Sequence, residues 1–88
     1  MLRITRMDGS RQATILRLEG RLTQADLADL DETIAACLTD NRRVVVDLAG
    51  IRFLDQSGAA ALLAAQREDV ELVGASAFVQ ELLEEVAS

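Results

Sequence analysis

The side chains best placed for chemistry stand in one short segment, Asp55-Gln56-Ser57-Gly58, between an apolar run and an alanine-rich run. A hydroxyl here can accept hydrogen bonds from the free N–H groups of a helix start, so we expect Ser57 to be an N-cap. Asp55 can bind backbone N–H groups of its own turn or, if exposed, an arginine of a partner. Gly58 allows close packing or an unusual backbone angle. These four residues form the candidate site.

Two further residues, Cys37 and Asp47, suggest other chemistries. Cys37 is the only cysteine and falls on an apolar stripe, so we expect a buried, inert thiol, with a redox switch as the alternative. Asp47 ends a β-branched run, as the phosphate-accepting aspartate of a receiver domain does, but that site also needs a lysine. The chain has no lysine. We therefore expect Asp47 on the exposed face of a sheet, paired with Arg17.

The composition leaves few residues for enzyme chemistry. Histidine, lysine, tryptophan, tyrosine and proline are all missing from the 88 residues, which removes the usual general base, the Schiff-base amine and most metal ligands. The sequence also has no glycine-rich loop of the kind that binds phosphates. We expect a protein that is not an enzyme and that uses neither a cofactor nor a metal ion.

Length and charge narrow the class of protein further. The 88 residues, half of them hydrophobic, suit a single domain over residues 1–88 with one core. Nine arginines against fifteen acids give a net charge of −6, and residues 44–88 hold two of these arginines and eight of the acids. A nucleic-acid partner is therefore not expected. No leader pattern or run of about 18 apolar residues is seen, so we expect a soluble, cytoplasmic protein.

The candidate site must be positioned by the elements around it, and the alternation of apolar and polar residues predicts four strands. The predicted strands cover residues 2–5, 14–19, 44–48 and 70–73. The first two form a hairpin around the turn residues Asp8-Gly9-Ser10. The third is the most β-branched run and so a central strand, which Ala49-Gly50 separates from a short apolar segment, Ile51–Leu54.

Three helices are predicted between and after the strands. Thr23 and Asp26 have the spacing of an N-cap and its N3 acid, and the helix they open should stop near Asp40-Asn41. The second helix covers residues 59–66, and Ser76 can cap the third. The apolar stripes are Leu27, Leu30, Ile34, Cys37 and Leu38 in the first helix, and Phe78, Val79, Leu82, Leu83 and Val86 in the third.

This order predicts a two-layer α/β fold with a four-stranded mixed sheet. Right-handed crossovers give the strand order 1-2-3-4, with strand 1 antiparallel and the helices on one face. The residues expected on the open face are Arg3, Thr5, Ala13, Ile15, Arg17, Glu19, Asp47 and Glu71. This face is polar enough to stay in water, so we expect a monomer or a weak homodimer. The acidic face of the third helix, with Glu81, Glu84 and Glu85, should also be solvated, with a docking patch for a basic partner as the alternative.

Several segments in the right order give the chain a resemblance to a known family. Residues 44–58 and the alanine-rich helix after them look like the signature strand, loop and helix of STAS domains, the fold of bacterial anti-sigma factor antagonists. Residues 18–22 and 70–76 are similar to the flanking elements. The resemblance extends from Leu2 to about Leu83.

The resemblance implies a partner-switching module in transcription regulation. Such a domain binds an anti-sigma factor with serine kinase activity, and phosphorylation of a serine ahead of the second helix releases it. Ser57 matches this serine, whereas Gln56 stands where family members often have another serine. Partner binding would involve Asp55, Gln56, Ser57 and Gly58. The alternative is an accessory subunit bound to the ATPase of a lipid-transporting ABC system, without direct insertion into the membrane.

Overall fold

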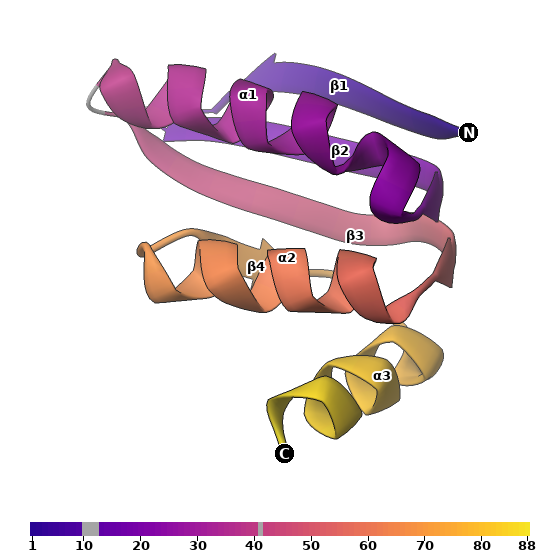
Figure 1. Cartoon of the computed structure of the whole chain (residues 1–88). Helices are drawn as coiled ribbons and strands as arrows, with labels where there is room; N and C mark the ends of the chain where they lie inside the picture. Colours follow the sequence, from indigo (N-terminus) through magenta and orange to yellow (C-terminus); the bar gives the residue numbers. More distant parts are fainter. Residues whose placement is uncertain (10–12, 41) are drawn as a thin grey trace.

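The structure, a computed structural model, describes residues 1–9, 13–40 and 42–88. The described residues form a two-layer α/β fold with one four-stranded sheet (Figure 1). The strands are β1 (Leu2–Asp8), β2 (Ala13–Leu22), β3 (Arg43–Leu54) and β4 (Glu71–Val73). The helices are α1 (Leu27–Thr39), α2 (Gln56–Arg67) and α3 (Ala77–Ala87), and a 3₁₀ turn, Gln24–Asp26, leads into α1. The strand order is β1-β2-β3-β4, with only β1 antiparallel, which confirms the predicted fold.

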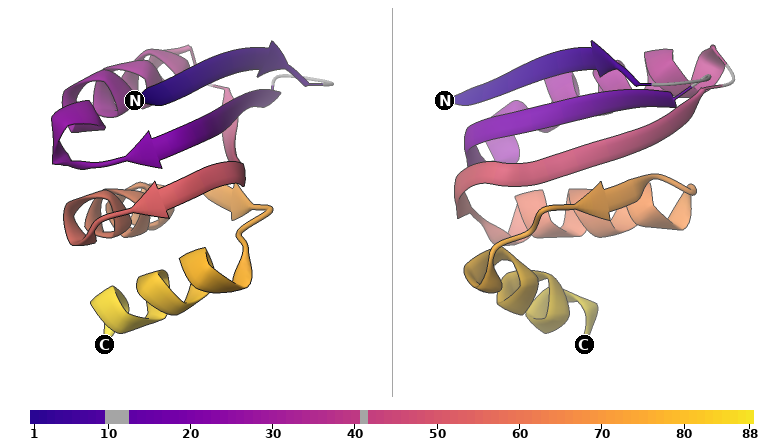
Figure 2. Two further views of the ribbon diagram at one scale, coloured as in Figure 1. Left: turned by 90° about the vertical axis from the view of Figure 1, so that its right-hand side faces the viewer. Right: turned by 180° about the vertical axis from the view of Figure 1, so that it is seen from behind.

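Helices α1 and α2 cover one face of the sheet, and the other face is open. The view from behind shows the strands in front and both helices behind them (Figure 2). The strand residues that point at the helices are almost completely buried, namely Leu16, Leu18, Val44, Val46 and Leu48. On the open face Arg17 Nε lies 3.7 Å from Asp47 Oδ2, which confirms the predicted pair.

The helices complete the core with their predicted apolar stripes. Leu30, Ile34 and Cys37 of α1 are buried, and Cys37 has no exposed surface. Helix α3 packs beside α2 and contacts β3. Val79 is its one fully buried residue, whereas Phe78, predicted on the same stripe, is 48% exposed. The prediction for Phe78 is wrong because α3 lies at the margin of the helix layer and turns only one flank inward.

Strand β3 is longer than the sequence pattern predicts. Ile51–Leu54 is not a separate segment, because β3 continues from Arg43 to Leu54. Its pairing with β2 shifts register twice, and each shift gives β3 one extra residue. Gly50 lies in the first shift, where a Cβ would come within 2.7 Å of Glu19 Cγ. The two bulges bring Leu54 beside Leu22.

The predicted turns and helix ends agree with the structure where it describes them. Strands β1 and β2 pair as the expected hairpin, although Ser10 lies outside the described residues. Asp26 Oδ2 accepts a hydrogen bond from Thr23 N at 3.0 Å, as the Thr-and-acid spacing predicts. Helix α1 ends at Thr39, and Asn41 is outside the described residues.

Candidate functional site

The candidate site lies where the carboxyl ends of β2 and β3 meet. These strands are parallel and end side by side at Leu22 and Leu54, and α2 begins immediately beyond β3 (Figure 1). The backbone N–H of Asp55 donates to Leu22 O at 3.3 Å, which fixes the loop to β2. The sheet therefore positions the first turn of α2.

Asp55 organises this loop with both of its carboxylate oxygens. Oδ1 accepts from the backbone N–H of Gly58 at 2.7 Å, and Oδ2 accepts from that of Gln24 at 3.1 Å. Asp55 has the extended backbone of an N-cap, with φ −91° and ψ 176°. The predicted loop-organising role is confirmed, and the bond to Gln24 also joins the start of α2 to the turn before α1.

Ser57 is not the N-cap, and this sequence prediction is wrong. Helix α2 begins at Gln56, so Ser57 is already its second residue. The carboxylate of Asp55 caps the helix instead, since it accepts a hydrogen bond from the backbone N–H of Gly58 in the first turn. Among the described residues, the hydrogen bonds of the structure do not include the Ser57 hydroxyl. Ser57 is half-buried, so this hydroxyl is free of the helix cap and partly open to solvent.

Gly58 serves close packing, one of its two predicted roles. Gly58 is buried, and a Cβ there would come within 2.6 Å of Leu22 O and 2.9 Å of Leu54 Cδ1. Its φ is not among the positive values of the described glycines, which belong to Gly20 and Gly74. The first turn of α2 therefore lies directly on the ends of β2 and β3.

A hollow of about 450 Å³ opens between the start of α2 and the end of α3. Its lining consists of Gln56, Ser57 and Ala60 from α2 and Leu82, Glu85 and Val86 from α3. The sequence did not place α3 here, although the partly buried Leu82 and Val86 were recognised on its apolar stripe. Gln56 and Ala60 are exposed, and Ala64 continues the exposed side of α2. The site therefore offers a hydroxyl and small apolar side chains beside one carboxylate.

The described part of the chain shows neither a metal cluster nor a membrane helix. No three His, Cys, Asp or Glu side chains in it gather as a set of metal ligands. None of the helices described here is long and apolar enough to cross a membrane. Glu81, Glu84 and Glu85 of α3 are exposed, as the solvated acidic face predicts.

The sequence matches one family over nearly its whole length. The family model described as "Mlab, STAS domain" matches residues 5–87. The chain belongs to the STAS domain family. No curated protein sequence matches this STAS domain.

Solved structures of anti-sigma factor antagonists share the fold of this STAS domain. SpoIIAA in its unphosphorylated form is 17% identical, with a TM-score of 0.75 over 93% of this chain and 82% of that chain. A STAS-domain antagonist from Rhodobacter sphaeroides is 29% identical, with a TM-score of 0.62 over 83% and 86%. One from Mycobacterium paratuberculosis is 18% identical, with a TM-score of 0.70 over 82% and 64%. The predicted resemblance is confirmed, and the chain has a SpoIIAA-like fold.

Proposed function

We propose that this STAS domain is a non-enzymatic interaction module that acts as an anti-sigma factor antagonist. It docks on a kinase-type anti-sigma factor through residues 55–58 and the exposed side of α2. The observation that carries the proposal is the state of Ser57. Asp55 takes over the helix cap, so the Ser57 hydroxyl is not required by the fold and is available for modification.

Phosphorylation of Ser57 would change the docking surface with little effect on the fold. A phosphate adds about −1.5 to −2 charges, and the first turn of a helix stabilises an anion. Glu85 lines the same hollow and would oppose the added charge. The phosphate would therefore point away from α3 toward the surface that the partner covers, and it would weaken docking.

The proposed setting is transcription regulation in the cytoplasm, with the domain as a monomer or weak homodimer. Ion pairs occupy part of the open face of the sheet, including Arg17 with Asp47 and Arg43 with Glu71. Charged pairs of this kind make an open face a poor surface for tight self-association. Sedimentation at low micromolar protein tests this point, since a stable dimer there contradicts it.

The experiment for the main proposal is a titration against the partner captured from native cells, with and without ATP. Wild type should bind and be released when the kinase and ATP are present. Ser57→Ala should bind with similar affinity and resist release. Thr23→Ala is the control, because it also removes a hydroxyl, from the residue next to Gln24, whose backbone N–H bonds to Asp55, but leaves Ser57 in place. Equal release of wild type and Ser57→Ala contradicts the switch.

A second candidate is an accessory subunit bound to the ATPase of a lipid-transporting ABC system. The observation that favours it is the half-burial of Ser57 beside Glu85, which disfavours a phosphate at this position. Under this function the same exposed side of α2 docks permanently on the ATPase. Recovery of a transporter ATPase without an anti-sigma kinase in the capture experiment supports this candidate and contradicts the first.

A further inference from the structure

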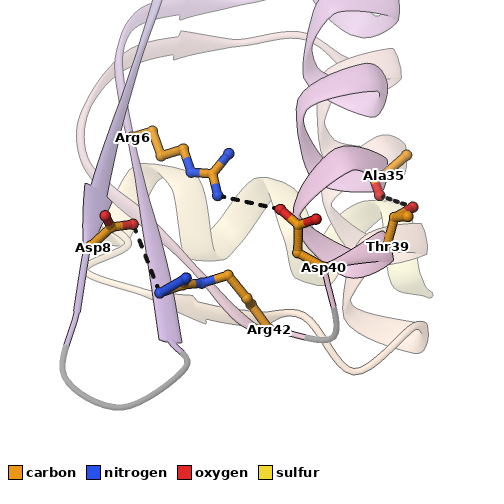
Figure 3. Close-up of polar contacts among 6 residues, drawn as sticks. All are labelled: Arg6, Asp8, Ala35, Thr39, Asp40 and Arg42. Carbon is orange, nitrogen blue, oxygen red and sulfur yellow. Dashed lines mark hydrogen bonds and ion pairs between the residues drawn. The ribbon is translucent and has the colours of Figure 1, made fainter.

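The arginines of the described chain divide into two groups. Four of them lie within 4.0 Å of a carboxylate oxygen. These pairs are Arg6 with Asp40, Arg17 with Asp47, Arg42 with Asp8, and Arg43 with Glu71. Figure 3 shows two of them, Arg6 with Asp40 at 3.7 Å and Arg42 with Asp8 at 3.9 Å, where the end of β1 meets the end of α1. Arg6 and Arg42 are therefore neutralised at this end of the sheet.

Three other arginines gather at the opposite end of the open face. Arg3 lies near the start of β1, Arg21 lies near the end of β2, and Arg52 occupies the second bulge of β3. All three are exposed, and none of them belongs to the ion pairs found among the described residues. Of the four described arginines outside these ion pairs, only Arg67 lies elsewhere, at the far end of α2.

An exposed aromatic ring and a hollow complete this surface. The guanidinium of Arg21 lies 5.3 Å from the centroid of the Phe53 ring, which is 39% exposed. Arg3 and Arg52 line a hollow of about 500 Å³ together with Glu19, Gly20 and Gly50. We call Arg3, Arg21, Arg52 and Phe53 the arginine patch.

We propose that the arginine patch binds an acidic segment of the protein partner that docks on α2. Guanidinium groups bind carboxylates through paired hydrogen bonds, and the exposed Phe53 ring offers an apolar contact beside Arg21. The patch adjoins the candidate site along the chain, since Phe53 stands two residues before Asp55, and Leu22, next to Arg21, accepts the bond from Asp55 N. This inference rests on the proposed function for the identity of the partner.

The negative charge on the rest of the molecule favours a short acidic segment as the ligand of the arginine patch over a larger anionic surface. The patch and Glu19 together carry three positive charges and one negative charge, which leaves six arginines and fourteen acids elsewhere in the chain. An anionic membrane or a nucleic acid would bring many phosphates close to that acidic remainder and be repelled. A few carboxylates on a protein segment bind the patch and avoid this repulsion.

A peptide titration tests the patch without the partner. The probe is a short blocked peptide of alternating glutamate and leucine, and the control probe has glutamine in place of glutamate. Amide NMR spectra of the full chain should shift around residues 3, 21, 52 and 53 with the acidic probe only. Joint replacement Arg3→Gln, Arg21→Gln and Arg52→Gln should weaken this binding about tenfold, since each exposed pair contributes about 0.2–1 kcal/mol.

The matched control is Arg67→Gln, because Arg67 is also exposed and outside the ion pairs but lies at the far end of α2. Arg67→Gln should bind the probe as wild type does. Equal binding by wild type and the triple variant, or no binding by either, overturns the proposal. Vesicles of equal parts phosphatidylcholine and phosphatidylglycerol form a second arm, and tighter binding to them than to the peptide would assign the patch to lipid and also overturn it.

The partner then separates this inference from the proposed function. The triple variant should lose affinity for the captured partner and Arg67→Gln should not, while Ser57→Ala tests the switch independently. If the peptide binds the patch but the kinase and ATP release Ser57→Ala as readily as wild type, the switch is contradicted and the patch is not. If Ser57→Ala resists release but the triple variant keeps its full affinity for the captured partner, the patch is contradicted and the switch is not.

Discussion

Helices α2 and α3 begin in the same way locally but sit differently on the sheet. In each, the N-cap side chain accepts a hydrogen bond from the residue three positions on: Asp55 from Gly58 at 2.7 Å and Ser76 from Val79 at 3.3 Å. That third residue is a glycine in α2 and a fully buried valine in α3. Helix α2 therefore lies so close to the strand ends that no side chain fits, whereas α3 is held off by one that fills the gap.

The caps differ in reach as well. Asp55 uses its second oxygen to bind Gln24, 31 residues away, while the Ser76 hydroxyl holds only its own turn. A carboxylate can serve two N–H groups at once through its two oxygens. The start of α2 is therefore a fixed junction of three segments, and the start of α3 is an ordinary helix end. A docking site gains from the first arrangement, because its side chains are held in place before the partner arrives.

The largest expected effect on stability comes from replacing Gly58, the third residue of α2. Gly58→Val should prevent stable folding, and Gly58→Ala should lower the free energy of unfolding by about 1–3 kcal/mol, because even one Cβ meets Leu22 O at 2.6 Å. Urea unfolding followed by circular dichroism measures the loss. Ala60→Val is the control, since Ala60 is exposed on the same helix. Full stability of Gly58→Ala would mean that α2 is free to move away from the sheet.

Removing the buried valine side chain at the equivalent position of α3 should lower the free energy of unfolding by less than Gly58→Val does. Val79→Ala removes two methyl groups from a fully buried side chain, for an expected loss of about 2 kcal/mol from transfer and cavity terms. The same unfolding measurement applies, with Phe78→Ala as the exposed neighbour that should change stability less. If Val79→Ala prevented folding as Gly58→Val is expected to, the contrast between the two helix starts would be contradicted.

Removing the N-cap side chain of α2 or of α3 should lower the free energy of unfolding by smaller amounts, with the larger loss in α2. Asp55→Ala should lose about 1–2 kcal/mol and Ser76→Ala about 0.5–1 kcal/mol, because both lie within the usual range for N-caps and only Asp55 serves a second segment. Hydrogen exchange at the amide of Gln24 reports that second contact directly. It should accelerate in Asp55→Ala and stay unchanged in Ser76→Ala. Unchanged exchange in both variants would contradict the junction.

The smallest expected effect is at Ser57. Ser57→Ala should change the free energy of unfolding by less than about 0.5 kcal/mol, since the residue lies inside α2, is half-buried and does not cap the helix. Thermal unfolding of the variant beside Asp55→Ala makes the comparison. A loss as large as that of Asp55→Ala would restore Ser57 as the residue that holds the helix start.

Local sequence patterns predicted the strands and helices well, but they predicted less well where a strand is bulged and where a helix begins. The alternation in β2 and in residues 44–48 located the strands and their buried face, because side-chain direction follows directly from strand geometry. The same pattern broke at Ala49-Gly50 and suggested that the strand ended. Beyond that point each bulge adds one residue, so the buried positions continue at Ile51 and Leu54 without alternation, and the position of the bulges depends on pairing with β2 rather than on β3 alone.

The candidate site was also predicted only in part from the sequence. Its four residues were identified from the sequence, together with the loop role of Asp55 and the packing role of Gly58. Which side chain caps α2 was predicted wrongly, because both Asp55 and Ser57 are good N-caps and their spacing alone does not decide where the helix begins. The contribution of Leu82 and Glu85 to the hollow followed only from the position of α3.

The sequence by itself determined the strands, the helices, the buried faces and the family, because periodicity and turn chemistry act over a few neighbouring residues. Only the tertiary structure decided that Asp55 bridges to Gln24 and that Gly58 lies against Leu22. It also decided that Arg21 lies over the Phe53 ring while Arg3 and Arg52 line one hollow. These contacts join segments far apart in the chain. Their geometry depends on strand register and on how closely each helix approaches the sheet, which no local pattern encodes.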